Sequence, residues 1–195
     1  MATYFTADLH FNHAGVINFD KRPFADVDEM NRSLVQYWNG RVTPKDEVYI
    51  LGDFSMSKKD TLEFAPKLKG RKYLILGNHD KKCPELRYVF EDVYEYRKIH
   101  LNKQTVILSH YFMPSYDGQH RGGVMLYGHS HNTPVSEAEE RVKDIYRENN
   151  IPIKAYNAGC MYFGYTPATL DEIVAYWKGR NFQPRVDRQG EVQDV

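Results

Sequence analysis

Short apolar runs that end in polar side chains recur along this chain. Five such runs span residues 4–7, 48–51, 73–76, 105–108 and 124–127, and an Asp, Asn or His follows each within two residues. Apolar runs of this length, rich in β-branched, aromatic and leucine residues, predict buried β-strands. Because strand ends can converge at one edge of a sheet, five endings of this kind predict a single polar site.

Helical spacing fills the gaps between the first three runs. A helix is expected from about Asp26 to about Gly40, with Glu29 completing a capping box with Asp26. A second helix is expected over residues 60–68 and closed by Gly70, whereas residues 11–24 are expected to form a loop. Strand, helix, strand, helix, strand predicts a parallel sheet covered by helices on both faces.

The second half of the chain has a different pattern. Apolar and polar residues alternate over 93–101, and a turn at 102–104 predicts a hairpin into the run at 105–108. Farther along, the pattern predicts a helix over 136–148 with Glu139 in its capping box, a strand over 151–155 and a helix over 169–179. No repeat or linker interrupts the pattern. We therefore expect one α/β domain over residues 1–180 and a loosely ordered tail over residues 181–195.

Composition narrows the classes of function only slightly. The 195 residues contain 26 Lys and Arg against 26 Asp and Glu, so net charge gives no general case for binding nucleic acid or a membrane. Two cysteines are too few for a thiolate zinc site and make a structural disulfide improbable. A strand begins near the first residue and no apolar run approaches the ~20 residues of a membrane span, so a cytoplasmic protein is expected.

The polar residues at the strand ends are donors suited to divalent metals. The set comprises Asp8, His10, Asp53, Asn78, His110, His129 and His131. Two transition metals about 3.5–4 Å apart can share a carboxylate, whose two oxygens serve separate cations. Imidazole favours Mn, Fe, Zn or Ni over Mg or Ca. The set therefore predicts a site for two divalent ions, with Mn preferred.

The spacing of these donors supports a common site. Asp8 and His10 are i and i+2 neighbours, as are His129 and His131, and an extended backbone places such pairs on one side of the chain. Glycines at positions 52, 77 and 128 precede three of the donors, where the lack of a Cβ permits a sharp turn. His79 is next to a donor and could protonate a leaving group as a general acid.

Taken together, the motifs resemble those of the calcineurin-like metallophosphoesterases. The matching blocks, in order, are Asp8-x-His10, Gly52-Asp53, Gly77-Asn78-His79-Asp80, His110 and Gly128-His129-x-His131. Within that superfamily the chain is similar to small prokaryotic and phage-encoded phosphoesterases, which also carry Asn-His and Arg-Pro-Phe elements like Asn12-His13 and Arg22-Pro23-Phe24. The resemblance extends to about residue 180. It implies two facing mixed β-sheets flanked by helices, in a four-layer αββα sandwich.

The resemblance also implies a role for each donor. One metal would bind Asp8, His10 and His131, the other would bind Asn78, His110 and His129, and Asp53 would bridge them. A hydroxide bridging the metals would attack phosphorus in line, and His79 would protonate the departing oxygen.

The chain departs from the family pattern at two positions. Relatives of the protein-phosphatase type have a second Asp and an Arg after the Gly-Asp block, and here those places are Met56 and Ser57. Asp80 and Ser55 are candidates for orienting His79 in place of that Asp. For gripping phosphate we expect Arg22, with help from His13, because a guanidinium matches phosphate through its planar fork.

These observations predict a two-metal phosphoesterase acting on a small phosphate ester by direct water attack, with phosphodiesters slightly preferred. The alternatives are a phosphomonoesterase, a nuclease or RNA-processing enzyme using the same metals, and a metal-binding scaffold without activity. A nuclease would need a basic, aromatic groove, so nucleic acid is a less favoured partner, and no membrane partner is expected. Tyr111, Phe112 and Tyr116 either wall the substrate pocket or pack beneath the loop after His110.

Overall fold

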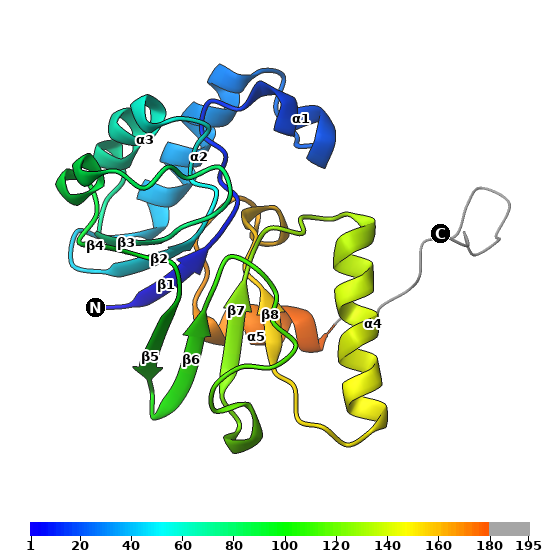
Figure 1. Cartoon of the computed structure of the whole chain (residues 1–195). Helices are drawn as coiled ribbons and strands as arrows, with labels where there is room; N and C mark the ends of the chain where they lie inside the picture. The colour runs from blue at the N-terminus through cyan, green and yellow to red at the C-terminus, as the bar shows by residue number, and fades with distance from the viewer. Residues whose placement is uncertain (180–195) are drawn as a thin grey trace, which may run out of the picture.

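Two four-stranded sheets form the centre of the structure, a computed structural model that describes residues 1–179 (Figure 1). The first sheet has the order β1-β2-β3-β4 and is wholly parallel. The second has the order β5-β6-β7-β8, with only β5 antiparallel to its neighbour. The predicted α/β fold with two sheets flanked by helices is confirmed, although only the second sheet is mixed. The predicted tail, residues 181–195, lies outside the described residues.

The elements have the following bounds. The strands are β1 (Thr3–Thr6), β2 (Glu47–Leu51), β3 (Arg71–Ile75), β4 (Asp92–Tyr94), β5 (Arg97–Leu101), β6 (Gln104–Leu108), β7 (Val124–Tyr127) and β8 (Ala155–Asn157). The α-helices are α1 (Ala14–Asp20), α2 (Val27–Arg41), α3 (Lys58–Phe64), α4 (Pro134–Glu148) and α5 (Leu170–Lys178). Short 3₁₀ segments cover Ala65–Lys67, Pro84–Tyr88, Gln119–Arg121 and Cys160–Phe163.

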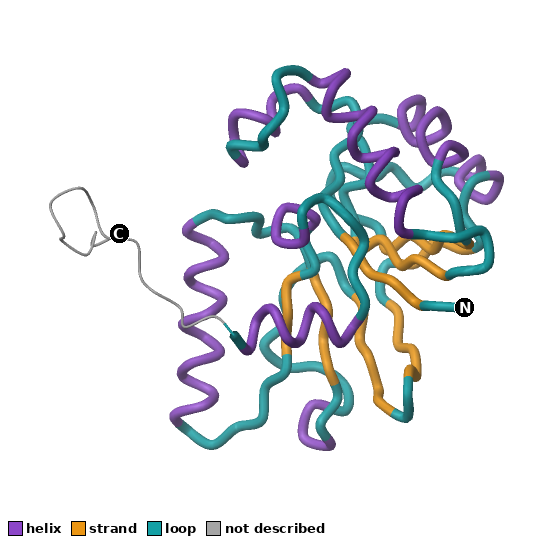
Figure 2. The backbone as a smooth tube through the Cα atoms, turned by 180° about the vertical axis from the view of Figure 1, so that it is seen from behind, coloured by secondary structure: helices purple, strands orange, loops and turns teal. Residues whose placement is uncertain are grey.

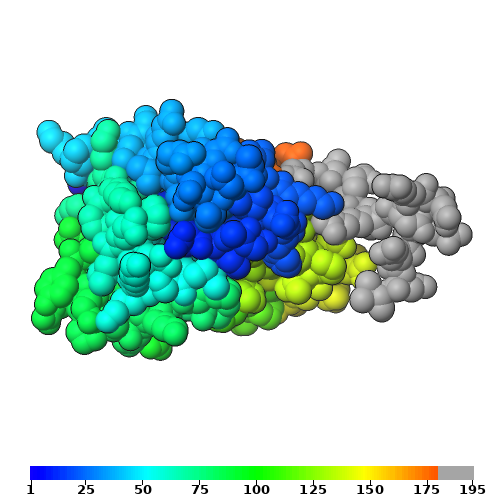
Figure 3. Space-filling view, turned by 90° about the horizontal axis from the view of Figure 1, so that it is seen from above, coloured from blue at the N-terminus to red at the C-terminus, as the bar shows by residue number. Residues whose placement is uncertain are grey.

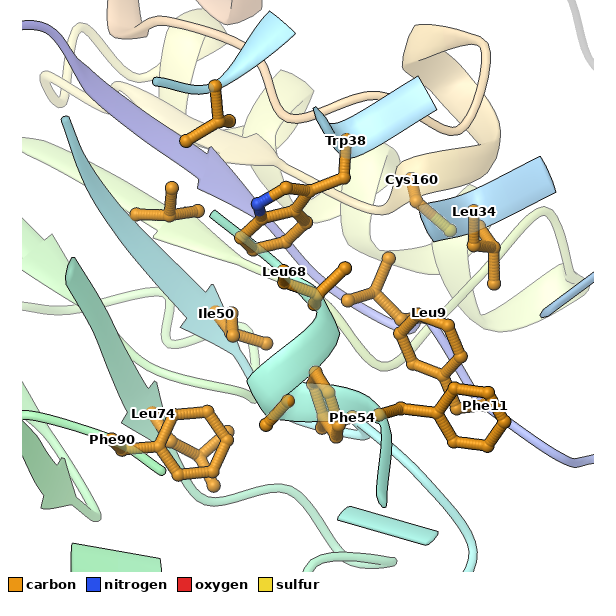
Figure 4. Close-up of a cluster of buried hydrophobic side chains, with 14 of the residues drawn as sticks. Leu9, Phe11, Leu34, Trp38, Ile50, Phe54, Leu68, Leu74, Phe90 and Cys160 are labelled. Carbon is orange, nitrogen blue, oxygen red and sulfur yellow. The ribbon is translucent and has the colours of Figure 1, made fainter. Parts of the chain in front are cut away.

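Alternation along the strands divides the apolar residues among three cores. On the outer face of the first sheet, Val48 and Ile50 of β2 belong to the same core as Leu34 and Trp38 of α2. Figure 4 shows Ile50, Leu34 and Trp38 in this core. The next residue along, Leu51, enters a different core because successive strand side chains point to opposite faces.

The second core lies between the sheets and the third lies on the outer face of the second sheet. Phe5 of β1, Leu108 of β6 and Ile173 of α5 belong to the core between the sheets. Seen from behind, α5 crosses the strands of the second sheet (Figure 2). The third core contains Met125 and Tyr127. Helix α4 covers this outer face, where its Lys143 donates to the Tyr127 hydroxyl of β7. The layers are therefore helices, first sheet, second sheet and helix. The prediction of helices on both faces of the parallel sheet is wrong, because the second sheet packs on its inner face.

Two helices begin at the capping residues that the sequence predicts. Asp26 accepts a hydrogen bond from the Glu29 amide (2.7 Å) and caps α2, although the Glu29 carboxylate accepts from the Ala25 amide instead of completing the predicted box. Thr169 and Glu172 form a complete capping box at the start of α5.

The predicted start of α4 is wrong. Thr133 caps this helix, which begins at Pro134, a residue well suited to the first helical position. Glu139 does not take part in a capping box, because its carboxylate faces inward and accepts from the Ser130 hydroxyl at 2.7 Å.

Two helix predictions also need correction. The expected loop over residues 11–24 contains α1, which has no side-chain cap and buries only Val16, so its sequence signal is weak. The helix expected over residues 60–68 ends as an α-helix at Phe64 and continues as a 3₁₀ turn that includes Pro66. Proline has no amide hydrogen and disrupts an α-helix at this point.

Two strand predictions also differ from the structure. The alternating segment 93–101 is divided between the sheets, with β4 pairing with β3 and β5 pairing with β6. The strand expected over 151–155 instead occupies β8, residues 155–157. Pro152 cannot donate to a ladder, and its carbonyl oxygen accepts from the Gln119 side chain at 2.8 Å.

No described helix is both long enough and apolar enough to cross a membrane.

Candidate metal centre

The segments after β1, β2, β3, β6 and β7 bring the predicted metal donors together. Three sets of side chains each offer donor atoms within 4.8 Å of one another: Asp8, His10 and His131; His10, Asp53 and His79; and Asp53, His110 and His129. Each set shares a residue with the next. Asn78 joins the last set, because its Oδ1 lies 3.1 Å from His110 Nε2. The structure therefore brings all seven predicted donors and His79 into one cluster.

Asp53 lies between the two ends of this cluster. Its Oδ2 is 3.7 Å from His10 Nε2 on one side and 3.5 Å from His110 Nε2 on the other. Beyond His10, the His131 Nε2 is 3.2 Å from His10 Nε2 and 3.8 Å from Asp8 Oδ1. A carboxylate between two groups of nitrogen and oxygen donors is the arrangement that a pair of divalent metals requires.

Neighbouring groups select the ring nitrogens that face the cluster. The carboxylate of Asp20 lies 2.8 Å from His131 Nδ1, and the Leu51 carbonyl oxygen lies 2.8 Å from His110 Nδ1. Each acceptor favours a proton on Nδ1 and leaves the Nε2 lone pair directed into the cluster. This is the tautomer that a metal-binding imidazole needs, so the residues present fit divalent metals.

The ionisation of two central groups, Asp53 and His10, also suits metals. Burial raises the pKa of Asp53, but its hydrogen bond and charge interaction with His110 outweigh this effect and bring the pKa to about 2. Burial, and after it the charge of His131, lowers the pKa of His10 to about 2. Near neutral pH, Asp53 is therefore a carboxylate and His10 is a neutral imidazole.

Five of the donors adopt a left-handed backbone conformation. Their φ angles are 58° at Asp8, 54° at His10, 53° at Asp53, 71° at His129 and 48° at His131. Positive φ is uncommon outside glycine and is typical of functional sites where surrounding structure enforces it. The i and i+2 pairs thus share a side through successive tight turns, and not through the extended backbone assumed from the sequence.

Two glycines allow these turns to approach one another. A Cβ at Gly52, whose φ is +90°, would lie 2.2 Å from His110 Nδ1. A Cβ at Gly128 would lie 2.6 Å from the Ala7 Cβ and 2.8 Å from Asp8 Oδ2. The glycine before His129 is therefore required by close packing, because its own φ is not positive.

Asp80 connects two of the turns and does not orient His79. Its carboxylate accepts from the backbone amides of Asp53 (2.8 Å), Phe54 (3.0 Å) and Gly77 (2.9 Å). Burial raises the pKa of Asp80 to about 6 despite these bonds. The second candidate, Ser55, bonds to the Ser57 carbonyl oxygen and the Thr61 hydroxyl.

His79 and His13 lie together at the edge of the cluster. The His79 amide donates to Asp53 Oδ1 at 2.9 Å, and its ring centroid lies 5.3 Å from that of His10 and 6.1 Å from that of His13. His13 Nδ1 is 3.4 Å from His10 Nδ1. Both predicted residues therefore lie beside the metal donors.

Arg22 has a different environment from the one expected of a phosphate clamp. Its guanidinium is fully buried and donates to the carbonyl oxygens of Asp8 (2.8 Å) and Leu9 (2.9 Å) and to the Asp20 carboxylate (2.9 Å). These bonds occupy the donors that would grip phosphate. The arrangement favours a positioning role, in which Arg22 fixes the turn that carries Asp8.

Several residues that support the site were not singled out from the sequence. Asp20 contacts both His131 and Arg22, and the pKa of its carboxyl lies below the usual range because these partners outweigh its burial. Ser130 Oγ donates to Glu139 (2.7 Å) and accepts from Asn157 (3.0 Å). These bonds stabilise the turn between His129 and His131. Of these residues, only Asp20 had a signal in the sequence, as an acidic residue two positions before Arg22.

The three aromatic residues after His110 have separate environments. Tyr111 is 47 % exposed and lies edge-on to His110 and His129, with centroid distances of 4.9 and 4.6 Å. Phe112 and Tyr116 belong to the core on the outer face of the second sheet. Of these three residues, therefore, only Tyr111 is placed where it could line a substrate pocket, and the other two pack in the core.

Comparison with known proteins agrees with this arrangement. The sequence profile of the calcineurin-like phosphoesterases matches residues 1–179. The chain belongs to this family. Among similar proteins, an uncharacterized protein of Methanocaldococcus jannaschii is 34 % identical over 174 residues, which cover 88 % of each chain. The gene 66 protein of Mycobacterium phage D29 is 29 % identical over 73 % of this chain and 85 % of its own.

A solved structure extends the comparison to the fold. The crystal structure of a protein of unknown function from Aquifex aeolicus has a TM-score of 0.68 and 28 % identity, covering 88 % of this chain and 96 % of that one. The prokaryotic and phage character expected of the relatives is confirmed.

Proposed function

We propose that this phosphoesterase uses two divalent metal ions, with manganese preferred, to hydrolyse phosphate esters by direct attack of water. The observation that carries the proposal is Asp53, whose carboxylate lies between two groups of donors. Asp8, His10 and His131 would hold one ion, and Asn78, His110 and His129 would hold the other. Bound ions would supply a hydroxide nucleophile near neutral pH and offset charge that develops at phosphorus.

Within this proposal, His79 is the general acid. Its imidazole is partly exposed at the edge of the cluster, while its backbone amide is bound to Asp53. It can therefore face a substrate and still keep a fixed position relative to the metal donors. The ring would give its proton to the departing ester oxygen. His13, on the same side, would donate a hydrogen bond to the phosphate in place of the buried Arg22.

The environment of the nearby nucleophilic side chains supports direct water attack. The Cys160 thiol is buried against the Asp8 carbonyl oxygen, and burial raises its pKa to about 12. Ser130 is occupied by Glu139 and Asn157. Neither side chain is available to form a phospho-enzyme. We place phosphodiesters slightly ahead of monoesters as substrates.

The test is hydrolysis by the manganese-loaded protein of a phosphodiester and a phosphomonoester, each with an alkyl and a 4-nitrophenyl leaving group. His79→Ala should lower kcat about 10²–10⁴-fold for the alkyl leaving group and less for 4-nitrophenolate, which needs no proton. His120→Ala, an exposed histidine outside the cluster, should retain wild-type rates. An equal loss on both leaving groups would contradict the acid role, and no turnover with two metals bound would contradict the proposed activity.

A further inference from the structure

Two exposed aromatic side chains lie at opposite ends of the metal centre. Phe19, on α1, is 65 % exposed and its ring lies edge-on to that of His131, with centroids 5.7 Å apart. Tyr111 is 47 % exposed and contacts His110 and His129. Phe19 therefore adjoins the donor group of Asp8, His10 and His131, and Tyr111 adjoins the group on the other side of Asp53.

The backbone at Phe19 is anchored relative to the metal centre. The next residue, Asp20, bonds to both His131 and Arg22, and Arg22 in turn bonds to the carbonyl oxygen of Asp8. Seen from above, the blue N-terminal segment that includes α1 lies on the surface beside the yellow-green segment that includes α4 (Figure 3). Phe19 is thus an apolar ring displayed at a fixed position and not a side chain of a core.

Packing does not explain this exposure. Phenylalanine side chains of the same region, such as Phe11 and Phe24, are buried at 0 % and 8 % exposure. An exposed ring contributes little hydrophobic stabilisation to the fold. It can instead contribute binding energy for a planar ligand group, because aromatic side chains stack on nucleobases and similar rings. A single exposed aromatic residue would mean little. Here two of them lie beside the two halves of one catalytic cluster.

We propose that Phe19 and Tyr111 are the walls of two substrate subsites that bind planar groups esterified to the phosphate, so that the substrate is a phosphodiester with an aryl or nucleobase-bearing group on each side of phosphorus. The inference rests on the proposed function, which positions the phosphate between the two donor groups. Balanced charge over the chain favours a small diester over a nucleic-acid polymer, whose binding depends on clusters of cationic side chains.

The experiment uses manganese-loaded protein and diesters that share 4-nitrophenolate as leaving group but carry methyl, phenyl or thymidin-5′-yl as the retained group. Wild type should prefer a planar retained group over methyl by about tenfold or more in kcat/KM, the scale of one stacking interaction. Phe19→Ala or Tyr111→Ala, whichever wall faces the retained group, should abolish that preference. The other variant should raise KM for all three diesters.

The control variants show whether the two rings bind the substrate or only hold the neighbouring histidines in place. Phe19→Leu keeps an apolar side chain without a flat face and should behave like Phe19→Ala. Tyr88→Ala removes an aromatic ring that is 70 % exposed and lies against Arg87, away from the candidate donors, and should leave all these rates unchanged. Thermal melting should be unchanged in all variants because the rings are exposed.

The outcomes are distinct. A preference for thymidine over phenyl that a wall variant removes would support the inference with a nucleobase as the bound group, and the reverse preference would support it with an aryl ester. If both wall variants lower kcat equally for methyl and planar diesters, the rings only support the histidines and the inference is wrong. Hydrolysis of monoesters but not diesters would also overturn it while leaving the phosphoesterase activity intact. Absence of all turnover with metals bound would overturn the proposed function itself.

Discussion

At the scale of single residues, the site depends on groups that lie behind the candidate metal donors and hold their rings in place. Asp20 determines the orientation of His131, and the Leu51 carbonyl oxygen does the same for His110. The sequence predicted the candidate donors because each lies shortly after an apolar run. It could not identify these orienting partners, since Asp20, the last residue of α1, approaches His131 only in the folded chain. The positive φ angles of Asp8 and Asp53 could not be predicted either, because they depend on how the turns pack in the folded chain.

Asp20→Asn should weaken metal binding, and it should also lower stability because the same carboxylate pairs with the buried Arg22 guanidinium. The amide is nearly isosteric but lacks the charge that makes His131 a stronger ligand, and loss of such an orienting partner typically costs 10–100-fold in metal affinity. Calorimetric titration with Mn²⁺ should show one weakened site. Asp28→Asn, on the exposed surface of α2, is the matched control. Wild-type affinity in Asp20→Asn would contradict the role assigned to this carboxylate.

Arg22→Ala should act mainly on stability. Removal of the guanidinium takes a hydrogen-bond donor from two buried carbonyl oxygens and from the Asp20 carboxylate, and breaking a buried charge pair costs about 3–5 kcal/mol. Urea unfolding of the metal-free protein measures this loss. A variant with unchanged stability and a raised KM would instead restore the phosphate-clamp interpretation.

At the scale of elements, the sequence predicted some ends of helices and strands, but it did not predict which strands pair with each other. The capping residues Asp26 and Thr169 and the hairpin turn after Leu101 were visible because their bonds are formed within a few residues. The division of residues 93–101 between two sheets was not visible. Alternation continues through the bend between β4 and β5, and only pairing with β3 and β6 distinguishes the two strands.

The β5–β6 turn offers a prediction about stability. Asn102 and Lys103 have φ angles of 49° and 65°, and a two-residue turn with both angles positive favours Asn-Gly. Lys103→Gly should stabilise the protein by roughly 0.5 kcal/mol, because relief of about 1–2 kcal/mol of left-handed strain exceeds the entropic cost of glycine. The change in melting temperature shows whether Lys103→Gly stabilises or destabilises the protein. Gln104→Gly, in the adjoining strand, should destabilise, and stabilisation by both would contradict the argument.

At the scale of the whole molecule, the fold provides one edge at which strands from both sheets end. Asp8 and Asp53 follow strands of the first sheet, while His110 and His129 follow strands of the second. The order of strand endings along the sequence predicted that the donors would meet. The close approach of the loops depends on packing of the two sheets over Phe5, Leu51 and Leu108, which strand patterns do not specify.

The central claim is that these strand ends bind two metal ions around Asp53. Anomalous diffraction from crystals of the manganese-loaded protein tests it most directly. We predict two anomalous peaks about 3.5–4 Å apart, one at Asp8, His10 and His131, the other at Asn78, His110 and His129, with the Asp53 carboxylate between them. A single peak, or peaks away from Asp53, would contradict the account.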